Sequence, residues 1–224
     1  MGDPLPALSA SEVRVLGSLI EKQITTPEYY PLTLNALTNA CNQLTNREPV
    51  VSFDEQTVVR ALDSLRDKRL ATLYSGAESR VAKYKHTLND AILLTPAETA
   101  LVCVLLLRGP QTVGELRTRA ERMSAFDSLA EVETTLQGLA TREPPLVIKL
   151  PRQPGTKESR YAHLLSGPPE TALPNVAAQS STAPTTPSSA EQNRIAQLEQ
   201  EIGDVRRELA ELKQQFADFR KQFE

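Results

Sequence analysis

The chain has 224 residues, 40% of them hydrophobic, and its 25 Lys and Arg nearly balance its 28 Asp and Glu, which leaves a formal net charge of -3. No global positive field therefore favours nucleic-acid binding, and the length suits two small domains with an extension better than one large enzyme core. The two cysteines lie inside apolar helical patterns and are too few for a disulfide framework, which indicates a reducing compartment.

The N-terminus begins "MGDPLPALSASE" and has no charged region followed by an apolar one, so a signal peptide is not expected. The longest apolar run, Ala100 to Leu107, is far shorter than the ~20 residues that a membrane span needs. We therefore expect a cytoplasmic protein with no membrane partner.

Helical periodicity begins at Leu8, and a similar pattern returns at Leu94. The segments "LSASEVRVLGSLIEKQ" and "LTPAETALVCVLLLRG" both open with a capping box, in which a hydroxyl and a carboxylate three residues later satisfy free amides at a helix start. The capping pairs are Ser9 with Glu12 and Thr95 with Glu98. Pro96 suits the first position of the second of these helices. The chain thus contains an internal duplication.

The duplication continues through a second and a third helix in each repeat. Second helices are expected in "LTLNALTNAC" after a Thr33 cap and in "QTVGELRTRAERM" after a Thr112 cap. Third helices are expected in "SFDEQTVVRALDSLRDKRL" and "SLAEVETTLQGLATRE", with the capping pairs Ser52–Glu55 and Ser128–Glu131. Each carries one apolar stripe at helical period, which predicts a core-facing side. The stripes are Val58, Leu62 and Leu65, and Val132, Leu136 and Leu139.

The connection between the second and third helices of the first repeat is the polar stretch "LTNACNQLTNREP". Asn tolerates left-handed backbone and bonds nearby amides, so turn chemistry explains much of this composition. A reading surface for another macromolecule is the alternative. We interpret the Asn residues as mainly structural, and select Gln43, Asn46 and Arg47 as the residues to mutate for function.

Each third helix is followed by a hairpin pattern. "LATLY" and "VAKYKHTL" flank one Gly-containing polar loop, and "LVIKL" and "SRYAHLL" flank another. Apolar or β-branched segments around such a loop predict a β-hairpin. Three helices and a hairpin, twice over, predict an α+β fold that is mainly α with small β-hairpins: tandem winged helix-turn-helix domains at residues 1–93 and 94–167.

Residues 168–190 are rich in Pro, Ala, Ser and Thr with almost no charge, a composition that predicts a flexible linker. In residues 191–224 apolar residues then recur by threes and fours, which predicts a coiled-coil seam of about four heptads. The seam residues are Ile195, Leu198, Ile202, Val205, Leu209, Leu212, Phe216, Phe219 and Phe223.

Charges beside the seam favour a parallel homodimer. With Ile195 at heptad position a, Glu201 faces the partner's Arg206 and Glu208 faces the partner's Lys213. An antiparallel pair would instead bring Arg206 against Lys213. The alternative is a single amphipathic helix that packs on its own winged domain.

The sequence has no glycine-rich phosphate loop, no clustered Cys and His ligands, and no nucleophile with a plausible base. We therefore expect no enzymatic activity, no metal site and no cofactor. The histidines, His86 and His163, occupy equivalent hairpin positions, which favours a structural role over one catalytic centre.

Local charge gives DNA binding limited support. Residues 1–93 carry ten Lys and Arg against eleven Asp and Glu, and residues 94–167 carry nine against eight. The third helix of a helix-turn-helix enters the major groove with its N-terminal turns nearest the bases. Here that turn is acidic, and Gln56 and Arg60 are the outward residues suited to base or phosphate contact. The third helix of the second repeat begins without a cation.

Better cationic candidates lie on the two wings and on the second helix of the second repeat. They are Arg80, Lys83 and Lys85; Lys149, Arg152, Lys157 and Arg160; and Arg117, Arg119 and Arg122. A wing that follows the backbone of a duplex could make phosphate contacts through such residues. The alternative is that they are ordinary solvated cations.

Three segments, "LIEKQITTPEYYPLTLNALTNACNQLTNREPV", "LLLRGPQTVGELRTRAERM" and "ESRYAHLLSG", resemble signature segments of the YceH-like family of uncharacterised bacterial proteins. The similarity covers roughly residues 7–167. The resemblance implies a tandem winged-helix fold and a bacterial cytoplasmic setting. It implies no activity, substrate or catalytic residue.

Two functions stay open at this point. The first is a dimeric protein that binds double-stranded DNA, such as a transcriptional regulator, which the expected fold and the wing cations favour. The second is a protein–protein interaction module or assembly adaptor without direct DNA contact. The acidic starts of the third helices and the near-neutral domains favour the second.

Overall fold

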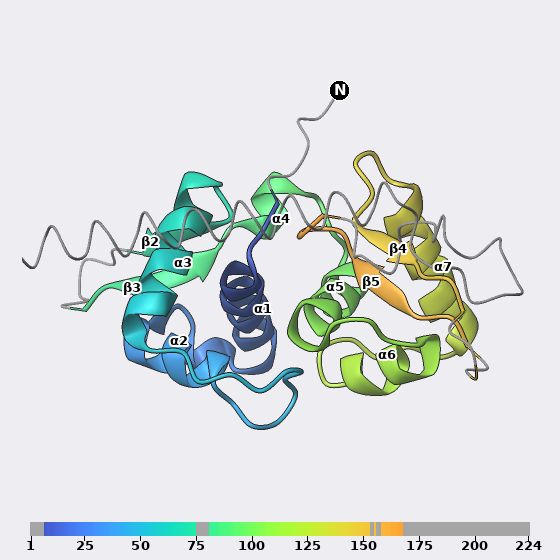
Figure 1. Cartoon of the computed structure of the whole chain (residues 1–224), viewed down its shortest axis with the longest axis horizontal. Coiled ribbons are helices and arrows are strands. Elements are labelled where there is room, and N and C mark those ends of the chain that lie inside the picture. Colours follow the sequence, from blue (N-terminus) through green and yellow to red (C-terminus); the bar gives the residue numbers. More distant parts are fainter. Residues whose placement is uncertain (1–6, 75–80, 153–154, 156–157, 168–224) are drawn as a thin grey trace, which may run out of the picture. The chain divides into compact units, whose positions relative to one another are not determined.

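The structure is a computed structural model (Figure 1). It describes residues 7–74, 81–152, 155 and 158–167. The chain divides into two compact units, Met1–Asn175 and Val176–Glu224, and all described residues belong to the first. The predicted linker at 168–190 and the predicted heptad helix at 191–224 lie outside the described residues.

Residues 7–93, here called the first lobe, combine helices with a small antiparallel sheet. Its elements are α1 (Ala10–Thr25), the 3-10 helix η1 (Pro27–Tyr29), β1 (Leu32–Thr33), α2 (Leu34–Cys41), α3 (Glu55–Asp67), β2 (Ala71–Tyr74), β3 (Lys83–His86) and α4 (Leu88–Ala91). The strand order is β1-β3-β2, and Tyr84 in the central strand lies opposite both Leu32 and Leu73. The predicted hairpin of the first repeat is confirmed, and β1 extends it to a third strand.

Residues 94–167, here called the second lobe, repeat this order in reduced form. The elements are α5 (Pro96–Arg108), α6 (Val113–Ala120), α7 (Leu129–Thr141), β4 (Val147–Lys149) and β5 (Tyr161–His163). β4 and β5 are antiparallel. In place of a strand equivalent to β1 there is one isolated bridge between Gln111 and Tyr161. The described chain is therefore mixed, with helices and small antiparallel sheets, as an α+β fold requires.

Most of the helix starts follow the predicted capping chemistry. Complete capping boxes form at Ser9 with Glu12, Thr95 with Glu98, and Thr112 with Glu115. Ser128 accepts from the amide of Glu131, and Pro96 is the first residue of α5. The side chain of Thr33 caps α2. Side-chain oxygens thus satisfy amides that have no partner inside the helix.

The predicted Ser52–Glu55 box is wrong. The cap of α3 is Asp54, whose carboxylate accepts from the amide three residues on at 2.8 Å. The side chain of Asn42 explains the later start, because its amide nitrogen donates to the carbonyl of Phe53 and its oxygen accepts from the amide of Phe53, both at 2.8 Å. This pair of bonds holds the chain before Asp54 outside the helix.

The core runs through both lobes, and α1 and α5 are its centre. The apolar stripes predicted for the third helices are buried, with at most 1% exposure at each of their six residues. α1 and α5 lie side by side, with α2 and α3 beyond α1 and with α6 and α7 beyond α5 (Figure 1). A Cβ placed on Gly17 of α1 would meet Leu107 Cδ2 at 2.9 Å and Leu106 Cβ at 3.1 Å. A larger residue at this position would require Leu106 or Leu107 to shift, so glycine suits the close approach of the two helices.

The two histidines end the second strand of each hairpin, as predicted. His86 is buried; its Nδ1 accepts from the amide of Leu88 at 3.3 Å, and its Nε2 is bonded to the side chain of Gln23. Burial lowers the pKa of His86 and of His163 to about 4, so both rings are neutral at pH 7. These contacts support the structural interpretation of His86. Within the described ranges, no helix combines the length and the apolarity that crossing a membrane requires.

Candidate functional site

Arg47, selected from the polar stretch as a functional residue, is the buried centre of the loop between α2 and α3. Its side chain is 0% exposed, and its Nη2 lies 2.5 Å from Oε2 of Glu21, a residue of α1 that is also 0% exposed. It donates further bonds to the carbonyl of Ala40 at 2.8 Å and to Oε1 of Gln43 at 3.1 Å. The prediction of Arg47 as a contact residue for nucleic acid or a partner is therefore wrong, because its donors face the core.

Asn46 and Gln43 serve the same loop. Asn46 has a left-handed backbone with φ 59°, as expected from turn chemistry. Its carbonyl accepts from Arg47, and its side-chain Oδ1 accepts from Nη2 of Arg108 in the second lobe at 2.7 Å. Gln43 supports the guanidinium of Arg47. Both residues are half-buried, and the bonds they make hold this loop against α1 and α5.

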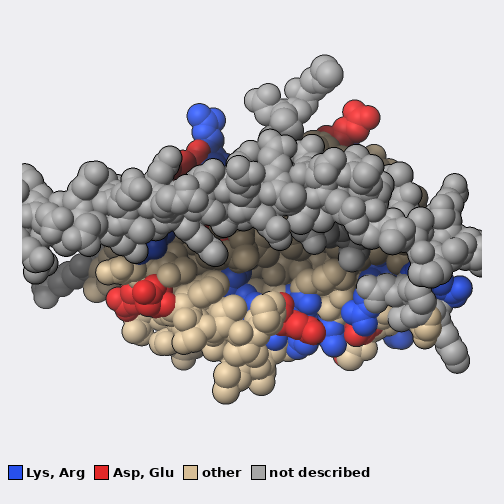
Figure 2. All heavy atoms as spheres, viewed as in Figure 1, with Lys and Arg blue, Asp and Glu red and all other residues tan. Residues whose placement is uncertain are grey.

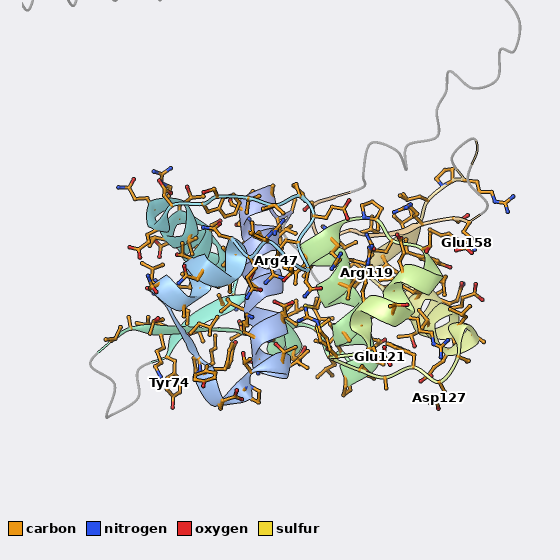
Figure 3. All side chains as sticks on the ribbon, turned by 90° about the horizontal axis from the view of Figure 1, so that it is seen from below. Arg47, Tyr74, Arg119, Glu121, Asp127 and Glu158 are labelled. Carbon is orange, nitrogen blue, oxygen red and sulfur yellow. The ribbon has the colours of Figure 1, made fainter. Side chains whose placement is uncertain are left out.

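Glu21 connects the two lobes electrostatically. Besides Arg47 it contacts Arg122, which follows α6 and is 41% exposed. Burial alone would raise the pKa of Glu21, but the hydrogen bond and charge of Arg47, together with the charge of Arg122, hold it below its usual value. We call Glu21, Asn46, Arg47, Arg108 and Arg122 the junction cluster. Figure 3 shows Arg47 and Arg119 labelled on the two sides of this junction.

The cations predicted on α6 and on the second wing are largely occupied within the second lobe. Arg117 donates from Nε to the carbonyl of Phe126 at 3.2 Å. Glu115 lies 3.6 Å from Arg119 and 3.4 Å from Arg160, and so pairs with both. Of the other predicted contact residues in the wings, Arg152 is exposed, and Arg80 and Lys157 lie outside the described residues. Arg117, Arg119 and Arg160 thus mainly hold the fold of the second lobe.

The sheet of the first lobe presents a different surface. Along β3, Tyr84 packs toward the core, so the alternation of a strand directs Lys83 and Lys85 to the opposite face. Thr72 lies opposite Lys85 and Tyr74 opposite Lys83. We call these four polar residues the outer sheet face. Tyr74 is the last residue of β2 and is labelled in Figure 3. No ion pair among the described residues involves either lysine.

The third helices offer little to a polyanion. Gln56 and Arg60 are exposed on α3, as predicted, and Arg60 donates to Gln56 at 3.4 Å. The carboxylate of Asp54 occupies the N-terminus of the same helix, and its hydrogen bonds to Thr57 lower its pKa. α7 has no Lys or Arg within Leu129–Thr141.

On the visible face of the described residues, Lys and Arg lie among Asp and Glu (Figure 2). Figure 2 shows Lys and Arg atoms between Asp and Glu atoms over α6 and the neighbouring loop before α3. Within the part of the chain that the structure describes, no group of three or more His, Cys, Asp and Glu side chains is placed to hold a metal ion.

Sequence reasoning missed Arg14, Glu21 and Arg108. Arg14 is buried on α1 and donates to the carbonyls of Cys41, at 3.5 Å, and Pro49, at 2.5 Å. One signal could have found Arg14 and Glu21: both lie in a helix whose every residue from Glu12 to Glu21 is buried, where charged groups need partners. No comparable signal exists for Arg108, which lies at the end of α5.

Comparisons with known proteins place these features in a family. A family profile described as "Protein of unknown function, DUF480" matches residues 8–156. A UPF0502 protein of Opitutus terrae is 56% identical over 201 residues, which are 89% of this chain and 84% of that protein. A UPF0502 protein of Geotalea uraniireducens is 58% identical over 203 residues, 87% of this chain and 88% of that protein. The chain therefore belongs to the DUF480/UPF0502 family of uncharacterised bacterial proteins, as the resemblance of its signature segments indicated.

Proposed function

We propose that this protein is a non-enzymatic, cytoplasmic DNA-binding protein whose two lobes are tandem winged helix-turn-helix domains. In this proposal the first lobe contacts the backbone of double-stranded DNA, and the C-terminal heptad segment at 191–224 joins two chains as a parallel homodimer. A role as a transcriptional regulator would follow from such binding.

The order of elements supports the winged-helix part of the proposal. In the first lobe a helix, a short strand, two helices and a hairpin follow one another, and the short strand joins the hairpin in the order β1-β3-β2. A second and a third helix joined by a connection, with a hairpin after them, is what a winged helix-turn-helix requires. The second lobe has the same order, with the Gln111 bridge in place of β1.

The observation that carries the DNA contact is the outer sheet face. Lys83 and Lys85 are partly exposed on one strand, without an ion pair among the described residues, and Thr72 and Tyr74 lie directly across from them. Lysines flanked by hydroxyl groups are a common means of binding phosphate oxygens. Because these contacts are made to the phosphate backbone of the DNA and not to its bases, they predict that the protein binds duplexes with little preference for their base sequence.

The acidic start of α3 determines the mode of contact. Asp54 and Glu55 at the N-terminus of that helix would lie against phosphates if the helix entered the major groove end-on. We therefore place the wing, and not this helix end, on the duplex, with Arg60 as an accessory phosphate contact.

A titration of the full chain with duplex DNA at several salt concentrations tests the proposal. The variant Lys83→Gln with Lys85→Gln removes two phosphate contacts from each chain, and so four from the proposed dimer. The slope of log affinity against log salt should therefore become shallower by about 4. Arg66→Gln is the matched control, because it removes a 46% exposed cation of the first lobe that is not among the predicted contact residues. It should leave the slope within experimental error. Absence of a complex with wild-type protein at low salt would refute DNA binding.

A protein–protein adaptor is the second candidate, and the surface of α7 favours it. This helix exposes Leu129 (49%) next to Glu131 and Glu133 and contains no cation. Such a face suits a polypeptide better than a phosphate backbone. If the wild-type chain fails to bind duplex DNA, chemical cross-linking in cells with a photoreactive residue at Leu129 becomes the decisive experiment. Recovery of one defined protein, lost on Glu131→Lys with Glu133→Lys, would establish the adaptor.

A further inference from the structure

Two hollows that share lining residues lie where the lobes meet. The inner hollow has a volume of about 310 Å³ and the outer one about 450 Å³. Both are lined by Glu48 and Pro49 from the first lobe and by Gly109 and Pro110 from the second. A Cβ placed on Gly109 would meet no heavy atom within 4 Å, so the space beside this shared wall is open.

The inner hollow is mostly apolar. Val13 of α1, Leu106 of α5 and Ala162 of β5 line it, and all three are buried. His163 also lines it as a neutral ring, and its Nδ1 is buried without a hydrogen-bond partner in the described structure. Apolar walls with a few polar groups are typical of small-molecule sites.

The outer hollow is cationic. Arg108 and Arg160 line it, and Glu48 is its only carboxylate. Burial, followed by the charge of Arg119, lowers the pKa of Arg108, which indicates that positive charges are crowded here. Nη1 of Arg119 is buried and has no hydrogen-bond partner in the described structure.

The charges of the two hollows do not balance. Arg14 lines the inner one, and it donates to the neutral carbonyls of Cys41 and Pro49 and not to a carboxylate. Together the walls hold three arginines, Arg14, Arg108 and Arg160, against one carboxylate, that of Glu48. Glu115 offsets part of the charge of Arg160 from outside the hollow, at 3.4 Å. A bound anion would complete the compensation.

We propose that this inter-lobe cleft binds a small amphipathic organic anion, with its apolar part in the inner hollow against Val13, Leu106 and Ala162 and its carboxylate or phosphate group between Arg108 and Arg160. Arginine suits both head groups, because its planar fork of donors matches their oxygens. The inner volume lies at the lower end of the usual range for ligand sites, about 300–1,000 Å³, so the apolar part is short.

Isothermal titration calorimetry of the full chain with octanoate and with phenyl phosphate tests the site. These probes distinguish a carboxylate from a phosphate head, and octanol is the neutral counterpart of octanoate. We expect at least one anion to bind with a Kd at or below about 1 mM and octanol to bind at least about tenfold more weakly. The assay contains no DNA, so its outcome is independent of the proposed function.

Variants assign the position of the anion. Arg160→Gln and Arg108→Gln should each weaken binding by about three- to tenfold, whereas Glu48→Gln should strengthen it, since the opposing charge is removed. Ala10 is exposed and lines the inner hollow, so Ala10→Trp narrows this hollow and should weaken the binding of both anions. Arg66→Gln, an exposed arginine on α3, is the matched control and should change nothing.

Three results would overturn the proposal. They are no binding of either anion to the wild-type chain, equal binding of octanol and octanoate, and unchanged affinity in the Arg108, Arg160 and Glu48 variants. Circular dichroism of each variant separates loss of the site from loss of the fold.

Discussion

Replacing Arg47 with Met removes a positive charge from the junction cluster and keeps an unbranched side chain. Glu21 then remains 0% exposed, with the partly exposed Arg122 as its remaining ion-pair partner. Removing one partner of a buried ion pair costs about 3–5 kcal/mol. Because Arg122 stays in place, we expect the lower end, a loss of about 3 kcal/mol. That is a large share of the ~5–15 kcal/mol by which domains are usually stable.

The loss of stability caused by Arg47→Met should depend on pH. The direction of this dependence follows from the pKa of Glu21. In the wild type the pKa of Glu21 is lowered, so its contribution to stability is present above the pKa of the unfolded chain and disappears as pH falls through the folded value. In the Met variant burial dominates and raises the folded pKa, so protonation then favours the folded state. The difference between variant and wild type should therefore shrink between pH 7 and about pH 4.

Urea unfolding followed by far-UV circular dichroism measures both effects. Arg66→Met is the control, because Arg66 and Asp63 are 3.2 Å apart but 46% and 61% exposed. An exposed pair of this kind contributes about 0–1 kcal/mol. A loss below about 1 kcal/mol for Arg47→Met, or a difference that widens on acidification, would contradict the role assigned to the junction cluster.

Three further predictions concern the close packing of the lobes and the tail. Gly17→Ala should lower the free energy of unfolding in urea by about 1–3 kcal/mol, because the added methyl group overpacks α1 against α5. Gly114→Ala on α6, where an added Cβ would have no neighbour within 4 Å, should raise it by up to about 1 kcal/mol. Equal effects of the two variants would refute the close approach of the helices. Cys41 and Cys103 are buried and burial raises the pKa of both thiols, so neither should react with Ellman's reagent before unfolding, and fast labelling at pH 8 would contradict this. Deletion of residues 191–224 should convert a dimer to a monomer in sedimentation equilibrium; the same oligomer with and without the segment would exclude it as the dimerisation element.

The helical part of the fold followed from the sequence because its signals are local. A capping box such as Thr95 with Glu98 and a stripe such as Val132, Leu136 and Leu139 need only residues within a few turns. Comparison of the two repeats also allowed the two hairpins to be predicted. β1 was missed because Leu32–Thr33 is too short for an alternating pattern.

The candidate site was harder to predict from the sequence, because its contacts join residues that are far apart along the chain. Arg47 reads as a surface cation in a polar run, yet its partner Glu21 lies 26 residues earlier. Asn46 similarly bonds Arg108, 62 residues later. No periodicity marks such pairs. Lys83 and Lys85 were named from the sequence as cations of the first wing, and the structure places them on β3, where a strand period of two directs both to one face. Their contact with DNA stays a prediction.

The arrangement of the lobes limits how the two proposals can be related. With the backbone of Gly17 against Leu106 and Leu107, and with Glu21 bonded to Arg47 and to Arg122, relative motion of the lobes must break a packed helix pair and a buried ion cluster. An anion in the inter-lobe cleft can affect DNA binding only if its affinity differs between two lobe arrangements. Linkage then requires that DNA change the affinity for octanoate by the factor by which octanoate changes the affinity for DNA. If each ligand leaves the other's affinity unchanged, the cleft and the outer sheet face are independent sites.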